Sequence, residues 1–341
     1  MSQLPSRLQR VYSETPFWLE TANVPGITVA LLERGKTCGV YHFGSTNSPY
    51  AIPGNLSKEA EGAASSEPSI PVTDATIFPA ASLSKQALLY AALKVIEMGA
   101  LDLDRPLVEY LSEPYGMDDP LIDLITARHV LSHTTGWINW PPKDKPVERL
   151  ARPGERWGYS GEGYLFLQEA LASILNESPI DYTRRLVLDP LGMEKSSFVW
   201  REEYDQTATN AYYPGGLMAD PWKITEVNGA ASLHTTAREY ALLLEAYLTP
   251  ELRVRHPHVY SPQVKMTERI GWTVGWGSAD DALWQWGQND GIKAFTALRP
   301  DHGLGIVCLT NSARGQRINK EWTNAWLEID LPAFYFRSVE V

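Results

Sequence analysis

Ser82 and Lys85 stand three residues apart in the segment Ser82-Leu-Ser-Lys85, where an apolar helical pattern begins. Positions i and i+3 share one face of a helix, so the lysine amine can lie beside the serine hydroxyl. A serine hydroxyl is a weak nucleophile that an adjacent base activates. Lysine can be that base when burial or a neighbouring cation lowers its pKa. The spacing therefore indicates a nucleophile, Ser82, whose proton is taken by Lys85.

The same spacing has a structural interpretation, in which the serine caps a helix and the lysine is exposed one turn later. Serine and lysine are common residues, so about one Ser-x-x-Lys is expected by chance in a chain of this length. Lys85 is, however, the only lysine in the sequence that stands three residues after a serine. That observation favours the catalytic interpretation, and the motifs described below add to it.

Length and composition limit the kind of fold that can position this pair and the partners that it can bind. With 341 residues, of which 44% are hydrophobic and 21% charged, the chain is expected to fold as one large globular domain or two. The net charge is −11 and no basic run alternates with aromatic residues, so a nucleic acid partner is not expected. No apolar run is long enough to span a bilayer, and a membrane partner is not expected either.

Two features of the chain predict a cytoplasmic protein. The N-terminal residues lack the apolar core and the cleavage site of a secretion signal. The two cysteines, Cys38 and Cys308, lie far apart in the sequence and are expected to be free thiols in a reducing compartment.

Periodicity predicts strands at both ends of the chain and helices between them. Residues 27–32 and 37–43 are expected to form a hairpin, and residues 45–74 a long surface loop. A helix is expected over 86–98, directly after the Ser82 motif. Further helices are expected over 127–131, 164–175, 179–187, 237–247 and 319–329, and further strands over 272–276, 282–286, 293–299 and 305–310.

This arrangement predicts a mixed α/β architecture in two parts. An α/β domain would be assembled from residues 1–80 and 235–341, and residues 81–234 would form a mainly helical domain inserted between them. The active site is expected in the cleft between the two parts.

Several segments around the Ser82 motif have the order and spacing of conserved motifs in a known family. They are Ile125-Thr-Ala-Arg-His-Val-Leu-Ser-His-Thr-Thr-Gly136, Pro153-Gly154 followed by Tyr159-Ser160 and Gly163-Tyr164, Pro190-Leu-Gly-Met193, Ser232-Leu-His-Thr-Thr-Ala237, and Gln285-Trp286-Gly287. Together with Ser82-Leu-Ser-Lys85, they resemble the serine β-lactamase-related family of class C β-lactamases, D-alanyl-D-alanine carboxypeptidases and family VIII esterases. The resemblance implies the β-lactamase/transpeptidase-like fold, with an antiparallel sheet, flanking helices and an inserted helical domain.

The resemblance also implies roles for individual residues. Ser82 would be acylated, while Lys85 and Tyr159 would share the proton transfers. We expect the phenol of Tyr159, beside an ammonium ion, to have a lowered pKa. The oxyanion would be bound by the backbone N–H groups of Ser82 and Gln288, and Gly287 would allow close approach of the backbone to a ligand. The register of the third motif could also be shifted by one residue, because Trp284 and Trp286 are both candidates for the tryptophan of the family's Trp-x-Gly form.

Two positions depart from the family pattern in the region expected to bind substrate. Gly161 replaces the asparagine that holds a substrate amide in the family, and Gln285 stands where a lysine or histidine is common. Without that cation, a substrate carboxylate loses a charge-assisted partner. These departures favour uncharged esters or amides. Glu162 is expected to be solvated rather than to replace the missing asparagine.

Other motifs give weaker evidence for a functional site. His129 and His133 have the i, i+4 spacing of helix-borne metal ligands but lack the intervening glutamate of His-Glu-x-x-His. The family resemblance implies that both are structural, so no metal or other cofactor is predicted. There is no Gly-x-Ser-x-Gly elbow, phosphate loop or dinucleotide fingerprint. Four tryptophans are candidates for the wall of an apolar acyl pocket: Trp137, Trp140, Trp284 and Trp286.

The sequence thus predicts a serine hydrolase of the carboxylesterase type that acts through an acyl-enzyme on a small ester or amide. One alternative is an acyltransferase of the same fold, in which an alcohol or amine replaces water. A second is a β-lactamase or D-amino-acid peptidase. A third is a non-catalytic relative that binds a ligand, against which the intact set of Ser82, Lys85 and Tyr159 argues.

Overall fold

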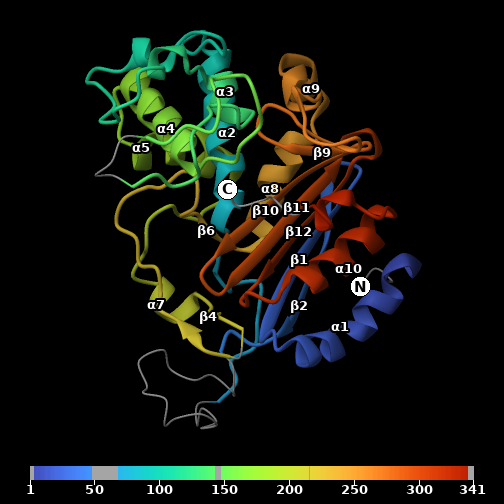
Figure 1. Cartoon of the computed structure of the whole chain (residues 1–341). Coiled ribbons are helices and arrows are strands. Elements are labelled where there is room, and N and C mark those ends of the chain that lie inside the picture. Colours follow the sequence, from blue (N-terminus) through green and yellow to red (C-terminus); the bar gives the residue numbers. More distant parts are fainter. Residues whose placement is uncertain (1–3, 48–67, 143–146, 215, 337–341) are drawn as a thin grey trace.

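A computed structural model describes residues 4–47, 68–142, 147–214 and 216–336. Its centre is an antiparallel eight-stranded sheet with the order β2-β1-β12-β11-β10-β9-β8-β7 (Figure 1). The strands of this sheet are β1 (Gly26–Glu33), β2 (Lys36–Gly44), β7 (Val264–Lys265), β8 (Ile270–Trp272), β9 (Gly277–Ala279), β10 (Ala282–Asn289), β11 (Ile292–Arg299) and β12 (Leu304–Thr310).

Both ends of the chain contribute to this sheet, as the sequence predicts. The hairpin of β1 and β2 turns at Arg34 and Gly35, both of which have positive φ angles. β1 then pairs with β12 in the register Ile27 to Thr310. The two-part domain division remains a prediction, and the predicted loop over 45–74 lies mostly in residues 48–67, outside the described residues.

The expected strand over 272–276 is wrong. β8 ends at Trp272 and β9 begins at Gly277, with a turn between them in which the N–H of Thr273 donates to the carbonyl of Trp276 at 2.7 Å. Gly275 adopts a φ of 96°, and a side chain there would overlap Leu89. The close approach of the turn to a helix therefore interrupts what periodicity presents as one strand.

Helices α1 (Gln9–Ala22) and α10 (Gln316–Leu327) cover one face of the sheet (Figure 1). The indole of Trp322 is fully buried there and donates to the hydroxyl of Thr15 at 3.0 Å. Helix α1, which contains Pro16, was not predicted from the sequence. The closing helix was predicted over 319–329, a few residues later than α10 lies.

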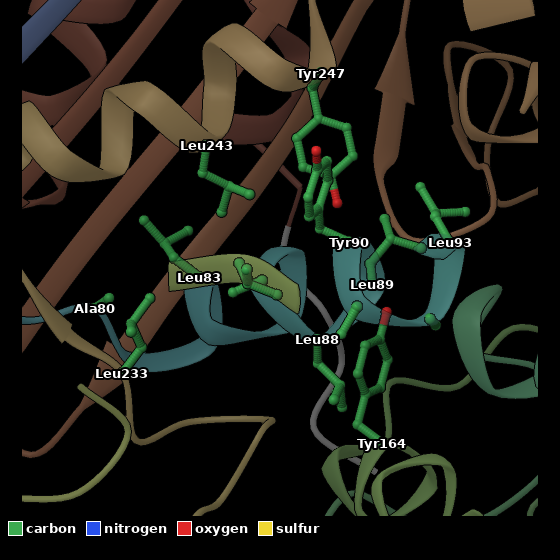
Figure 2. Close-up of a cluster of buried hydrophobic side chains, with 14 of the residues drawn as sticks. Ala80, Leu83, Leu88, Leu89, Tyr90, Leu93, Tyr164, Leu233, Leu243 and Tyr247 are labelled. Atoms are coloured by element: carbon green, nitrogen blue, oxygen red, sulfur yellow. The ribbon is translucent and has the colours of Figure 1, made fainter. Parts of the chain in front are cut away.

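The other face of the sheet carries α8 (Ala237–Tyr247) and the helical segment around α2 (Ser84–Glu97). Nearly every side chain of α2 is buried, including Leu88 and Leu89, and Figure 2 shows them packed with residues of α4 and α8. Truncation of one such leucine to alanine typically costs about 2–5 kcal/mol. Helices α4 (Gly161–Leu175) and α5 (Pro179–Thr183) pack against α2, and α5 continues as a π-helical turn over Arg184–Leu188. Helix α3 (Ala127–Leu131) packs against α4.

The cysteines are free thiols, as predicted: Cys38 is exposed on β2 and Cys308 is buried in β12. Among the described residues, no helix combines the length and apolar character needed to cross a bilayer.

Candidate active site

Ser82 lies in a short 3-10 turn, Ala81–Leu83, that leads directly into α2. The residue before it, Ala81, has a φ of 50°, a left-handed conformation that costs a non-glycine residue energy. Ala81 and Leu83 are completely buried, whereas Ser82 is partly exposed. Burial on both sides fixes the strained turn and directs the serine side chain away from the core.

Lys85 is fully buried one turn after Ser82, so the predicted pair is present. Its Nζ lies 3.2 Å from the Oγ of Ser82 and donates to the carbonyl oxygen of Ala230 at 2.9 Å. Burial lowers the pKa of Lys85 to about 7, because the ammonium form loses its hydration. A large fraction of Lys85 is therefore neutral near pH 7 and able to accept a proton from the hydroxyl.

Tyr159 completes the group from the segment before α4. Its hydroxyl oxygen lies 3.4 Å from Nε2 of Gln285, and the centre of its ring lies 4.8 Å from Nζ of Lys85. Burial raises the pKa of Tyr159, although hydrogen bonds with Ser82 and Gln285 act in the opposite direction. The expectation of a lowered pKa is wrong because desolvation of the phenolate outweighs these contacts. Tyr159 is thus a protonated phenol near pH 7.

His133 holds the Tyr159 segment in place. Its Nδ1 accepts the backbone N–H of Ser160 at 3.1 Å, and its ring lies 4.3 Å from the ring of Tyr159. Burial, together with the charge of Lys85, depresses the pKa of His133 well below its usual value, so the ring is neutral. His129 instead forms a capping box with Thr126 at the start of α3. Both histidines have structural partners, and no group of three or more potential metal ligands occurs in the described part of the chain.

The third motif lies on β10, with Gln285 and Gly287 facing the Ser82 turn. Nε2 of Gln285 lies 3.3 Å from the carbonyl oxygen of Ser82 as well as close to Tyr159. A Cβ at Gly287 would approach the carbonyl oxygen of Ala80 to 2.6 Å, which explains why glycine is needed here. The register Gln285-Trp286-Gly287 fits these contacts. Gln288 follows at an exposed position, and its backbone N–H remains a predicted oxyanion donor.

The space beside Gly161 is filled by a tryptophan. A side chain at position 161 would overlap the indole of Trp140, while the N–H of Gly161 donates to Oδ1 of Asn139 at 2.8 Å. The loop before α4 therefore occupies the place where an asparagine side chain would project. Glu162, expected to be solvated, is half-buried and accepts the hydroxyl of Tyr115 at 2.6 Å.

The four tryptophans proposed for an apolar pocket separate into two groups. Trp137 and Trp284 are fully buried in the core, so the expectation that they line a pocket is wrong. Trp140 is 47% exposed, and Trp286 is partly exposed with its ring stacked on Tyr159 at 5.8 Å.

Two contacts of the site were not predicted from the sequence. Ala230 contributes only its carbonyl oxygen to Lys85. Every residue has a backbone carbonyl, so this contact cannot be predicted from the residue type. Lys293 on β11 lies opposite Gln288 and donates to its side chain. The Asp290-Gly291 turn between these strands was the signal that could have placed this cation beside the third motif.

A family model described as "Beta-lactamase" matches residues 15–330, which is nearly the whole chain. The chain belongs to the β-lactamase family. This family is one of serine hydrolases, and its assignment agrees with the Ser82, Lys85 and Tyr159 arrangement described above.

Solved structures share the fold at low sequence identity. A penicillin-binding protein homologue from Pyrococcus abyssi superposes with a TM-score of 0.78 and 20% identity, covering 96% of this chain and 80% of its own. A class C β-lactamase gives a TM-score of 0.76 and 18% identity, covering 96% of both chains. These likenesses show the β-lactamase/transpeptidase-like fold.

Curated relatives align over shorter stretches. Esterase EstB of Burkholderia gladioli is 27% identical over 180 residues, 43% of this chain and 45% of that protein. A β-lactamase of Providencia stuartii is 25% identical over 52% of this chain and 43% of its own length. Acyltransferase calJ of Penicillium decumbens is 29% identical over 41% of this chain and 37% of its own length. The chain thus spans less than half the length of each of these relatives.

Proposed function

We propose that this protein is a serine hydrolase of the carboxylesterase type, which cleaves small uncharged esters through an acyl-enzyme on Ser82. The neutral Gln285 amide carries this proposal, because it faces Tyr159 where the family often places a cation. Trp140 supports it by filling the space of the family's amide-binding asparagine. A site with these two groups favours an apolar acyl portion over one that bears an amide or a carboxylate.

In the first step, Ser82 Oγ attacks the ester carbonyl carbon and transfers its proton to neutral Lys85, 3.2 Å away. The carbonyl oxygen becomes an oxyanion and is bound by the N–H groups of Ser82 and Gln288. Removal of one such donor typically costs about 10²- to 10³-fold in kcat.

Collapse of the tetrahedral intermediate expels an alkoxide, which takes its proton from the hydroxyl of Tyr159. Burial raises the pKa of Tyr159, but an aliphatic alkoxide is a stronger base than a phenolate, so the proton passes from the phenol to the alkoxide. Lys85, now protonated, returns a proton to Tyr159. In the second half-reaction, water attacks the acyl carbon and gives its proton to the Lys85 and Tyr159 pair. The bond between the acyl carbon and Ser82 Oγ then breaks, Oγ takes the proton from that pair, and the acid is released.

Labelling with a fluorophosphonate tests this proposal. The wild-type protein should gain one phosphonyl adduct, which peptide mapping places on Ser82, and should lose esterase activity in parallel. Ser82→Ala should neither be labelled nor turn over a short acyl ester, while retaining its melting temperature. The exposed serine variant Ser261→Ala is the matched control and should be labelled like wild type. Absence of any adduct on wild type would overturn the hydrolase proposal and favour a ligand-binding relative.

A further inference from the structure

A group of aromatic side chains lies beside Tyr159, at an open edge of the sheet. β9 pairs with β10 only from Ala282 to Trp284, so in the described structure the rest of β10 has no strand neighbour on that side. Trp286 lies on this free part of β10, and its ring stacks on Tyr159 with an interplanar angle of 27°. Trp157 stands two residues before Tyr159 in the chain, and the centres of their rings are 6.5 Å apart.

The C-terminal segment supplies the third member of this group. After the 3-10 turn Pro332–Phe334, the ring of Phe336 meets Trp157 edge-on at 5.9 Å and lies 6.4 Å from Trp286. Phe334 anchors the segment by packing on Phe295 at 4.2 Å.

We call Trp157, Trp286 and Phe336 the aromatic wall. All three side chains are partly exposed, and none carries a charge. A partly exposed apolar surface that adjoins a reactive group is suited to bind an apolar part of a substrate.

The position of the wall relative to Tyr159 determines which part of a substrate it meets. The leaving oxygen must lie beside the Tyr159 hydroxyl to receive its proton, so the alcohol portion of an ester lies on the Tyr159 side of Ser82. Trp157 and Trp286 both contact the Tyr159 ring, and Phe336 contacts both tryptophans. We infer that the aromatic wall binds the alcohol portion of the substrate and that Phe336 is a specificity-determining residue for aromatic alcohols. This inference rests on the proposed acyl-enzyme mechanism.

The same wall then selects the acceptor in the second half-reaction. An alcohol that occupies the place of the departed alcohol attacks the acyl carbon on Ser82, and its proton passes to the Lys85 and Tyr159 pair. The bond between the acyl carbon and Ser82 Oγ breaks, and Oγ recovers the proton. The products are a new ester and free enzyme, so the step needs no further reactant. The protein should therefore transfer acyl groups to aromatic alcohols in preference to small polar ones.

The experiment measures how one acyl-enzyme partitions between acceptors. Wild-type protein is acetylated with p-nitrophenyl acetate in the presence of benzyl alcohol or ethanol at equal concentration, and benzyl acetate, ethyl acetate and acetate are quantified by chromatography. Phe336→Ala, Phe336→Tyr and the exposed neighbour Tyr335→Ala are compared with wild type, with circular dichroism and melting curves for each. Because every product arises from the same acyl-enzyme, the product ratios are independent of the acylation rate.

We expect wild type to form more benzyl acetate than ethyl acetate, and Phe336→Ala to lower this ratio about 3- to 10-fold, the effect of losing one aromatic contact. Phe336→Tyr keeps the ring and should retain the ratio, as should Tyr335→Ala. An unchanged ratio in folded Phe336→Ala, or a wild-type ratio below one, would overturn the inference while leaving hydrolysis intact. Should Phe336→Ala fail to fold, the wild-type ratio and its retention in Phe336→Tyr decide the question. Failure to release p-nitrophenol at all would instead count against the proposed function.

Discussion

Lys85 and Tyr159 have pKa values that burial shifts in opposite directions. The charged form of lysine is the protonated one, so desolvation lowers its pKa to about 7. The charged form of tyrosine is the deprotonated one, so desolvation raises its pKa. The two groups are therefore neutral together near and above pH 7, one as an acceptor and the other as a donor. Such separation of neighbouring pKa values is what assigns base and acid roles.

The pH dependence of turnover should report Lys85. Only neutral Lys85 accepts the serine proton, so kcat/KM for a neutral ester should rise with pH and level off above about 7. Below that value, it should fall about tenfold per pH unit as the amine is protonated. The measurement is kcat/KM from pH 5 to 9 with spontaneous hydrolysis subtracted. An acid limb centred near pH 4 to 5 would point to a carboxylate base instead.

Removal of either Lys85 or Tyr159 as a proton carrier should lower kcat strongly, and removal of both should lower it little further. Lys85→Ala and Tyr159→Phe should each lower kcat about 10²-fold or more, the scale of general acid–base catalysis. Because both groups serve one proton path, the double variant should lose far less than the product of the two single losses. The measurement is a double-mutant cycle in kcat with a short acyl ester, with melting curves as the control for folding. Multiplicative losses would contradict a shared path.

At the scale of elements, the N-terminus of α4 is held in place by the loop before it. Ser160 caps the helix, Asn139 accepts the N–H of Gly161, and Trp140 packs where a side chain at position 161 would extend. Any residue larger than glycine must displace this indole or the helix start. Replacing Gly161 by the family's asparagine is therefore not a simple restoration of a binding group.

Gly161→Asn should consequently destabilise the protein by about 1–3 kcal/mol, the usual cost of overpacking, and should lower activity because Tyr159 is two residues away. Trp140→Ala removes the obstructing ring, so Gly161→Asn should cost less in that background. The measurement is the free energy of unfolding in urea for both single variants and the double variant. Equal costs of Gly161→Asn with and without Trp140 would show that the indole does not fill this space.

The sequence predicts the elements that carry strong local patterns. The β1–β2 hairpin and α2 follow from alternation and helical spacing, and the Ser82 and Lys85 contact follows from the i, i+3 rule. The turn at Gly275 was missed because its cause is the nearby Leu89, which is remote in sequence. The raised pKa of Tyr159 was missed because burial cannot be read from a charge pattern.

At the scale of the whole molecule, the site depends on segments from distant parts of the chain. The Ser82 turn contacts Gln285 of β10, and β10 belongs to the sheet that also includes the N-terminal hairpin. Phe336 adds the C-terminal segment to the surroundings of Tyr159. The sheet is built from both chain ends, and it holds Gln285 next to Ser82 and Tyr159. We therefore expect substrate choice to depend on the assembled fold rather than on the Ser82 motif alone.

That assembled site should prefer small neutral esters to substrates with a carboxylate. A carboxylate placed beside neutral Gln285 loses hydration and gains no charge-assisted partner there. Lys293, which contacts the side chain of Gln288, is the cation by which the fold could offset this loss. The measurement is kcat/KM for a short acyl ester and for a cephalosporin, on wild type, Gln285→Lys and Lys293→Ala.

We expect wild type to favour the ester, and Gln285→Lys to raise relative activity on the cephalosporin. The gain should be at most that of one charged hydrogen bond, about 1.5–3 kcal/mol. Lys293→Ala, the matched loss of a cation, should leave the ester rate within about twofold if the side chain is only a neighbour of Gln288. A wild-type preference for the cephalosporin that Lys293→Ala abolishes would contradict the esterase proposal, because it would make Lys293 the carboxylate partner of a β-lactamase or peptidase.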